Sequence, residues 1–373
     1  MKTNYFFSMA AGLLLMAGCA QNEITIESPD ANPPVSFDVY TGVQTRGPEN
    51  TLPKVQNTGF GIFGYYTGQT AWASAAASAT PNYMFDQKAT YSSSSSTWSY
   101  TPVKYWPNKS GDKVTFFAYA PHSTTANSGI ATSAKGATGN PYLDFTLQTN
   151  PLNSVDLVTA DAKDKTKSTD KVGFTFKHVL SRAKFLAKAS ENLASGSHVF
   201  IKSVKIQGSS NNTGSKFYTK ARYTFSADTW DYATSNVTIP TADYDLANIL
   251  KTTAQTSMGG YTTASVDVTG TTAVSLFKDN EFFFFIPVAN ATGTAENNIK
   301  VEIVYDIVTV DAALNTGHSK AENTVVVALP KETLKKGSAY NYNFTVGMSK
   351  IEVTATAVDA WTVASPDSQV TVP

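Results

Sequence analysis

The residue best placed to do chemistry is Cys19, the only cysteine in the chain. It follows the small residues Ala17 and Gly18, a short apolar stretch and the positive charge of Lys2. This order is typical of a secretory signal, and its ending on cysteine is typical of a bacterial lipoprotein. The thiol is required because a thioether to diacylglycerol forms on the sulfur before a peptidase cuts ahead of it. We therefore expect residues 1–18 to be removed and Cys19 to be lipidated, with an ordinary signal peptide as the alternative.

No second set of reactive residues is visible in the sequence. The histidines are scattered without the spacing of metal ligands, and they are His122, His178, His198 and His318. There is no Gly-x-Ser-x-Gly elbow, no glycine loop for phosphate and no pairing of carboxylates for glycosidic chemistry. We therefore expect no catalytic residue, metal site or cofactor, and we predict a binding or structural protein rather than an enzyme.

The aromatic residues of the first half offer a binding alternative. Five of them cluster, namely Trp72, Trp98, Tyr100, Tyr105 and Trp106. Flat aromatic platforms stack on sugar rings, whereas aromatic side chains in a β-protein more commonly fill the core and fix strand register. We favour core filling and keep a glycan platform as the second interpretation.

The composition limits the classes of partner that the chain can have and the interactions that can stabilise it. Lys+Arg and Asp+Glu balance at 29 each, so there is no basic excess to attract nucleic acid. After the signal, no apolar run reaches the roughly 18 residues of a membrane-spanning helix. A chain with one cysteine forms no internal disulfide, so core packing and sheet hydrogen bonds must stabilise it.

The elements that would position these residues are mostly strands. Apolar residues alternate with polar ones over residues 299–307 and 340–346, which is the period of a half-buried strand. Shorter strands are expected over residues 37–40, 60–66, 114–120, 174–177, 184–188, 199–207 and 351–356. The apolar run 281–286 predicts a strand buried on both faces. The only helix candidate is 242–253, so the sequence predicts an all-β, sandwich-like fold.

The chain divides into four expected parts. Residues 1–18 form the signal peptide, and the polar, proline-containing residues 19–34 form a flexible tether. The most charged window, residues 161–170, fits either a linker or the tip of a long hairpin. We prefer the linker because it leaves halves of domain size, an N-terminal β-sandwich over 35–170 and a C-terminal one over 171–373.

Several segments in a fixed order resemble the fimbrillin-like family, the pilins of type V pili. They are F-D-V-Y-T-G at 37–42 with Thr45-Arg46 after it, G-F-G-I-F-G-Y-Y at 59–66, P-V-K-Y-W-P-N at 102–108, V-T-F-F-A-Y-A-P at 114–121, F-K-H at 176–178 with Arg182-Ala183 after it, and D-A-W at 359–361. The resemblance spans nearly the whole chain after the signal. It implies two transthyretin-like β-sandwich domains in tandem after the lipoprotein signal peptide.

The resemblance also implies a route of assembly. It implies a lipid anchor at the cell outer membrane, export to the surface, and cleavage between Arg46 and Gly47 by an arginine-specific protease. Cutting removes the first strand, whose alternate residues Val35, Phe37 and Val39 we expect to be buried in the first sandwich. A donor strand from another fimbrial subunit then fills the open edge. Residues 368–372 have the alternation that a donor needs but form a short segment.

Two alternatives to a stalk pilin stay open at this point. Pro48 lies close to the bond and hinders proteases, and an uncut chain would be an anchor or tip subunit with a ligand on a host or bacterial surface. A surface glycan-binding lipoprotein of a nutrient-uptake system would share the signal and the sandwiches, and would use Trp72, Trp98 and Trp106.

Overall fold

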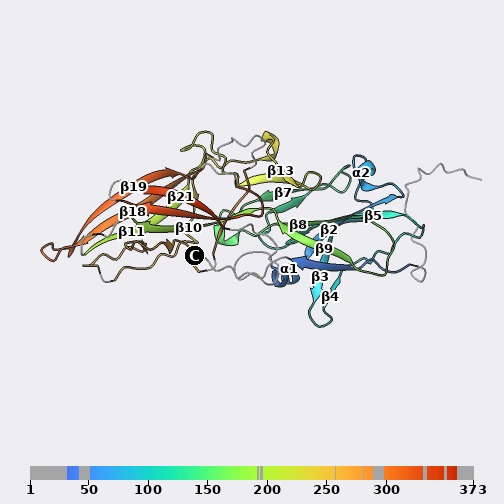
Figure 1. The fold of residues 1–373 in the computed structure, drawn as a ribbon, viewed down its shortest axis with the longest axis horizontal. Coiled ribbons are helices and arrows are strands. Elements are labelled where there is room, and N and C mark those ends of the chain that lie inside the picture. The colour runs from blue at the N-terminus through green and yellow to red at the C-terminus, as the bar shows by residue number, and fades with distance from the viewer. Residues whose placement is uncertain are drawn as a thin grey trace, which may run out of the picture.

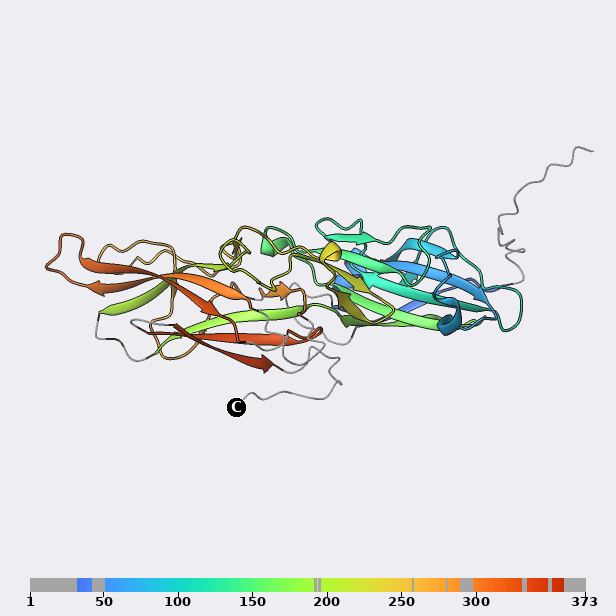
Figure 2. The ribbon, with the colours of Figure 1, turned by 90° about the horizontal axis from the view of Figure 1, so that it is seen from above.

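The computed structural model describes residues 32–41, 51–190, 193, 196–256, 258–279, 281–288, 298–330, 334–347 and 351–358. The molecule is elongated, with two β-rich lobes end to end along its long axis (Figures 1 and 2). Strands dominate, which agrees with the predicted all-β class. The described helices are short: α1 (Leu52–Thr58), α2 (Trp72–Ala75) and two 3-10 turns (Pro151–Asn153 and Thr234–Asn236).

The lobe that begins the chain is built on a seven-stranded sheet. In spatial order its strands are β1 (Phe37–Thr41), β9 (Val172–His178), β8 (Val158–Lys165), β5 (Lys113–Ala120), β2 (Phe60–Gly68), β3 (Met84–Ser92) and β4 (Thr97–Ser99). The two outermost strands, β1 and β4, contact each other, so the sheet curls around an apolar core. Because side chains alternate between faces, Phe60 and Ile62 enter this inner core while Phe63 and Tyr65 point to the outer face.

A four-stranded sheet covers that outer face. Its strands, in order, are β13 (Thr229–Asp231), β12 (Lys220–Thr224), β7 (Tyr142–Thr146) and β6 (Ile130–Thr132). The rings of Phe117 and Phe225 meet across the two sheets with their centroids 5.3 Å apart. The first lobe therefore includes strands from well beyond residue 170.

The second lobe is a sandwich of two sheets. One contains β16 (Val274–Ser275), β10 (Ser181–Ala189), β20 (Ala339–Val346) and β21 (Ile351–Val358), with β17 (Phe283–Phe285) beside β10. The other contains β14 (Tyr244–Asp245), β11 (Ser197–Ile206), β18 (Lys300–Val310) and β19 (His318–Ala328), with β15 (Val266–Asp267) beside β11. One apolar core runs from Phe63 in the first lobe to Phe344 in the second.

Every predicted strand is present, but the predicted helix over residues 242–253 is wrong. Leu246, Ile249 and Leu250 are buried as the pattern required. They form a single turn, closed by Ile249 N donating to Leu246 O at 3.0 Å. Lys251 N then donates to Leu276 O at 2.8 Å, so the backbone leaves the turn for a bridge to a distant segment. Helical spacing of apolar residues here reflects one buried turn and not a helix.

The charged window at residues 161–170 is the tip of a hairpin and not a linker. Residues 161–165 continue β8, and β9 follows in the same sheet, where it pairs with both β8 and β1. A cut between residues 170 and 171 would therefore pass through one sheet, and strands β12 and β13 would stay with the first lobe. The hairpin alternative explains the charge, because the turn between two long strands extends into solvent.

Candidate functional site

The first strand, β1, occupies an edge of the curled sheet and buries one face. Val35, Phe37 and Val39 are 2%, 2% and 4% exposed, whereas Tyr40 on the other face is 57% exposed. This alternation confirms the expected burial of the three apolar residues. We call the surroundings of these side chains the β1 seat.

Backbone hydrogen bonds hold this segment on both sides. Residues 37–41 run parallel to β9, with Phe37 opposite Val172. Just before them the chain pairs in the antiparallel sense with the loop after β4, where Val35 N donates to Lys104 O at 2.8 Å. Trp106 N donates to the carbonyl of Pro33 at 3.1 Å in the same pairing. The seat therefore fixes the direction and the register of the strand that fills it.

Phe37 lies inside a ring of four aromatic side chains that come from separate strands and a loop. Its ring stacks on Phe174 at 5.4 Å with 15° between the planes. Phe116 lies edge-on at 5.4 Å, Tyr100 is tilted at 5.5 Å, and Phe60 lies edge-on at 6.5 Å. Such contacts add about 0.5–1.5 kcal/mol each to the free energy of apolar burial.

The buried hydroxyl of Tyr100 fastens the start of the strand. It donates to Val35 O at 2.7 Å and accepts from Lys104 N at 3.3 Å. Burial raises the pKa of Tyr100 to about 12, and the backbone hydrogen bond from Lys104 acts in the opposite direction. The phenol is therefore still protonated, and still donates, at pH values where an exposed tyrosine has ionised.

Replacement of Tyr100 by phenylalanine should change how stability depends on pH. We expect Tyr100→Phe to be about 1 kcal/mol less stable at pH 8, because Val35 O loses its donor. Between pH 10.0, the ordinary pKa of a tyrosine, and a pH of about 12, the raised pKa of Tyr100, the unfolded chain ionises this hydroxyl while the folded chain does not. The wild type alone loses this contribution as pH rises through that window, so the difference should shrink. Urea unfolding at several pH values from 8 to 11.5 measures it, and a constant difference would contradict the assignment.

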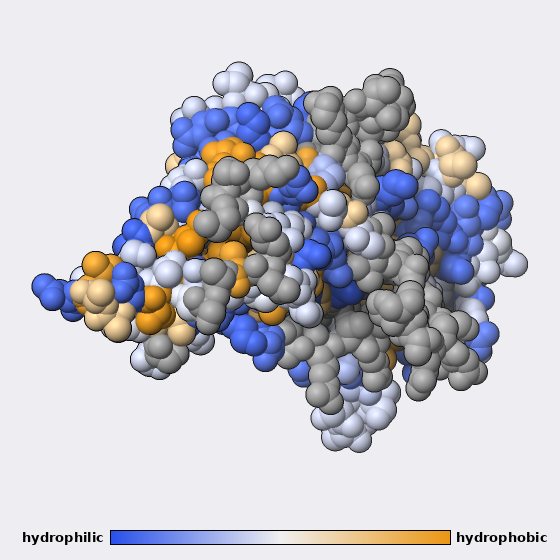
Figure 3. Space-filling view, turned by 60° about the vertical axis from the view of Figure 1, so that its left-hand side comes forward, coloured by the Kyte–Doolittle hydropathy of each residue, from blue (hydrophilic) through white to orange (hydrophobic). Residues whose placement is uncertain are grey.

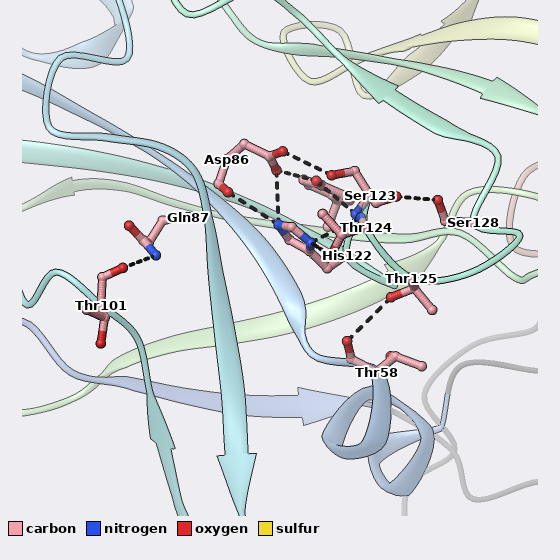
Figure 4. A network of polar contacts seen from close by, with 10 residues as sticks. Thr58, Asp86, Gln87, Thr101, His122, Ser123, Thr124, Thr125 and Ser128 are labelled. Atoms are coloured by element: carbon pink, nitrogen blue, oxygen red, sulfur yellow. Dashed lines mark hydrogen bonds and ion pairs between the residues drawn. The ribbon is translucent and has the colours of Figure 1, made fainter.

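Helix α1 packs against the same seat. Val55 is fully buried in the core that also holds Phe37, and α1 contacts β1. The end of the helix is held by the loop that follows β5, since His122 N donates to Gly59 O at 3.3 Å and Thr125 Oγ1 donates to Thr58 O at 3.5 Å (Figure 4).

That loop is fixed by a polar network around Asp86 (Figure 4). Ser123 Oγ donates to Asp86 Oδ2 at 3.0 Å, and the Tyr119 hydroxyl donates to Asp86 Oδ1. His122 Nε2 lies 3.5 Å from Asp86 Oδ1, and its Nδ1 lies 2.8 Å from Thr124 Oγ1. The serine thus donates to the carboxylate and not to the imidazole, so the cluster lacks the base that a nucleophile needs. It anchors the loop and α1, and the sequence pattern did not indicate it.

The residues predicted to be lipidated or cut, Cys19, Arg46 and Gly47, lie outside the described residues. The motif at 359–361 and the donor candidate 368–372 also lie outside them.

The other two arginines of the sequence lie in strands. Arg182, in β10, is partly buried with its guanidinium 4.5 Å from the ring of Phe282. Arg222, in β12, donates to both carboxylate oxygens of Asp144 at 2.7 and 3.0 Å. A protease that needs an extended, accessible arginine therefore meets neither of them in the folded chain.

The tryptophans proposed as a sugar platform fill the core instead. Trp72 is 4% exposed and Trp106 is 2% exposed. Trp98 is partly buried, with its ring 4.8 Å from Phe60. The core-filling interpretation is confirmed for Trp72 and Trp106, and neither side chain presents a flat face to solvent.

The histidines beyond His122 have local roles. His178 Nδ1 lies 2.7 Å from the carboxylate of the fully buried Asp156, His198 stacks on Phe200 at 5.7 Å, and His318 lies 2.9 Å from a backbone carbonyl. Within the ranges that the structure describes, no group of three His, Cys, Asp or Glu residues could hold a metal ion. In the same ranges, no helix has the length and apolar character needed to cross a membrane.

The second lobe has open sheet edges of its own. Among the described strands, β19 and β21 each pair on one side only. The hairpin of β18 and β19 reaches the far end of this lobe (Figure 1) and exposes Val310, Leu314 and Val326, which are 40%, 42% and 45% accessible. Apolar side chains surface among polar ones on this lobe (Figure 3).

Comparison with known proteins places these features in context. A family model described as Fimbrillin-like matches residues 45–361. The fimbrium subunit Fim1C of Phocaeicola vulgatus is 37% identical over 383 aligned positions, which cover 98% of each chain. The crystal structure of a fimbrial protein from Bacteroides vulgatus superposes with a TM-score of 0.77 at 33% identity, covering 89% of this chain and 100% of that one.

Proposed function

Because this chain belongs to the fimbrillin-like family, we propose that it is a structural subunit of a surface fimbria that joins its neighbours by exchanging strand β1. It is a fimbrial protein and not an enzyme, and its partners are other fimbrial subunits. In this function the subunit is cut at Arg46, carries a lipid on Cys19 and folds as two transthyretin-like domains in tandem.

The order of β1, Arg46 and α1 along the chain supports the strand-exchange mechanism. Strand β1 is an edge strand that buries Phe37 and Val39, with Val35 buried just before it, and Arg46 follows shortly after its last residue, Thr41. Helix α1, which comes after Arg46, is fastened separately to the body through Thr58 and Gly59. A cut at Arg46 would therefore free the strand and leave the helix in place.

An emptied seat is energetically unfavourable. Burying Val35, Phe37 and Val39 contributes about 1.5–3 kcal/mol for each side chain. The sum is comparable with the roughly 5–15 kcal/mol that separates folded from unfolded states of a typical domain. An edge with unpaired N–H and C=O groups beside apolar side chains also favours strand addition. Cleavage should thus be coupled to capture of a replacement strand, and repetition would build a filament.

Treatment with an arginine-specific protease tests this function. We expect the wild type to be cut once, to lose its N-terminal segment and to form oligomers on gel filtration. Because the other two arginines are held in strands, the matched variant Arg46→Ala should stay whole and monomeric. If the cut wild type and the variant both remain monomers, strand exchange is wrong, and an anchor or tip role at the membrane takes its place.

Attachment to the outer membrane is a separate prediction. We expect Cys19 to be acylated, because the signal delivers this thiol to the lipid-transfer machinery, and the residues after it to act as the tether. The expected tether over residues 19–34 is too long at its end, since Asn32 is buried and the Pro33 carbonyl accepts from Trp106 N at 3.1 Å. Metabolic labelling with a palmitate analogue should mark the wild type strongly and Cys19→Ser at background level. Equal labelling of both proteins would refute the lipid anchor and leave the fimbrial assignment intact.

A further inference from the structure

A polar cleft in the first lobe lies apart from the inner core that holds β1, and strand exchange does not use its side chains. We infer that this cleft binds an acidic sugar, a pyranose with one carboxylate such as a uronic acid at the end of a surface polysaccharide. Such binding goes beyond assembly of the fimbria and is independent of strand exchange.

The cleft lies between the outer face of the seven-stranded sheet and the turn that joins β12 to β13 in the four-stranded sheet. Alternate residues of β8 and β9 form one wall, and residues 225–228 form the other. Its volume is about 260 Å³. Pockets for drug-sized molecules occupy roughly 300–1,000 Å³, so this smaller cleft suits a single ring. It is open to solvent, because the side chains of Asp161 and Lys163 in its lining are 48% and 43% accessible.

The charges around the cleft include one cation more than the anions require. Lys163 Nζ lies 2.8 Å from Asp161 Oδ2, and Lys336 Nζ contacts the carboxylate of Asp228. Lys177 also lines the cleft, and among the described residues it takes part in no ion pair and no side-chain hydrogen bond. A ligand with a single negative charge therefore complements the cleft.

Hydroxyl groups from both walls indicate what the rest of the ligand is. Thr175 and Ser226 line the cleft from opposite walls, and neither hydroxyl has a hydrogen-bond partner in the part of the chain that the structure describes. Serine and threonine hydroxyls donate and accept, as the hydroxyls of a sugar do. The carboxylate of an acidic peptide would satisfy Lys177 but would leave these two hydroxyls to water. The lining therefore favours a carboxylated polyol over an aliphatic acid.

One acceptor in the cleft is held in a fixed orientation. The Tyr223 side chain is buried, and its hydroxyl accepts from Thr159 Oγ1 at 3.2 Å and donates to Asp228 Oδ1. Lys336 holds Oδ2 of the same carboxylate from the second lobe. A carboxylate held at both oxygens can accept from sugar hydroxyls at a smaller cost in side-chain entropy than a mobile one.

Saturation-transfer NMR with small probes tests this binding on the uncut chain. The probes are methyl β-glucuronide, methyl β-glucoside, which lacks the carboxylate, acetate, which lacks the ring, and a capped glutamate, which carries its carboxylate on a peptide unit. Lys177→Gln removes the unpaired cation, and Thr175→Val removes a hydroxyl while keeping the side-chain shape. The matched control is Lys171→Gln, which removes the same charge from an exposed residue just before β9, roughly 20 Å from Lys177 along the strand direction. Thermal unfolding of each variant shows that it is folded.

We expect the glucuronide to bind at least about tenfold more tightly than the other three probes, because it alone meets both Lys177 and the hydroxyls. Lys177→Gln should weaken it about tenfold and Thr175→Val several-fold, while Lys171→Gln should stay within about twofold of the wild type.

Three results would overturn the inference. Equal weakening by Lys171→Gln and Lys177→Gln would mean long-range attraction and not a site. If acetate or the capped glutamate binds as tightly as the glucuronide, the cleft takes an anion or an acidic peptide and not a sugar. If no probe binds, the cleft is not a binding site. Each of these results leaves strand exchange untouched, because the uncut chain is used throughout.

Discussion

Truncation of Phe37 to alanine is expected to lower the free energy of unfolding of the uncut chain by about 3–5 kcal/mol. The side chain is 2% exposed and lies among the rings of Phe60, Tyr100, Phe116 and Phe174. The three phenylalanine rings belong to strands of one sheet whose hydrogen bonds prevent collapse onto the void, so the loss should fall in the upper part of the range for large-to-small substitutions. Urea unfolding followed by tryptophan fluorescence measures it.

The control is Tyr40→Ala on the same strand. Its side chain is 57% exposed, and its hydroxyl donates to Asp38 Oδ2 at 3.2 Å. We expect the free energy of unfolding to stay within the error of the measurement, because this side chain lies on the exposed face of the strand. Amide hydrogen exchange of β9 should rise in Phe37→Ala and stay unchanged in Tyr40→Ala. Equal destabilisation by the two substitutions would mean that β1 is not seated by its buried face.

Replacement of Lys202, in the second lobe, by methionine should lower the free energy of unfolding about as much as Phe37→Ala does. The reason here is electrostatic. Lys202 lies at the bulge in β11, with Nζ 3.0 Å from Oδ1 of the fully buried Asp306. Burial opposes the charge on Lys202, but its hydrogen bonds to Glu322 and Asp306 outweigh burial and raise its pKa. In Lys202→Met the Asp306 carboxylate still accepts from the Tyr261 hydroxyl at 2.7 Å, but it has lost the cation of Lys202. We expect the free energy of unfolding to fall by about 3–5 kcal/mol, because breaking a buried ion pair leaves an uncompensated charge in the protein interior.

Two further variants separate charge from packing. Glu322→Gln removes the exposed partner of Lys202, and because the Glu322 side chain is 55% accessible and screened by solvent, it should leave the free energy of unfolding almost unchanged. Adding Asp306→Asn to Lys202→Met should recover most of the loss, because the buried charge disappears while the amide still accepts from Tyr261. If the double variant is as unstable as Lys202→Met alone, the packing of the lysine stem, and not the ion pair, stabilises this site.

Local pattern proved sufficient for the strands and for the face each one buries. In and just before β1, apolar residues alternate with their neighbours at Val35, Phe37 and Val39, and the alternation alone predicts which side is buried. The same holds for β18 and β20, whose apolar residues recur every second position. The family could also be recognised from the sequence, because its segments are ordered along the chain, and the family match confirms it.

The local sequence pattern gave wrong predictions wherever backbone pairing with a segment distant in sequence determined the structure. Residues 242–253 have helical spacing, yet backbone bonding to Leu276 draws the chain out of its single turn. Residues 161–170 have the composition of a linker, yet pairing of β8 with β5 and β9 makes them a strand and a hairpin tip. The polar network around Asp86 joins residues that no motif connects.

The sequence by itself determined the all-β class, the buried face of β1, the place of the only cysteine after a short apolar stretch, and the position of Arg46 between the first strand and the body. Only the tertiary structure decided that β1 runs parallel to β9, that four rings from separate segments enclose Phe37, and that strands from beyond residue 170 complete the first lobe. The physical reason is that periodicity records whether a side chain is buried, whereas the partner that buries it is chosen by long-range strand pairing. That pairing depends on the whole chain and leaves no local trace.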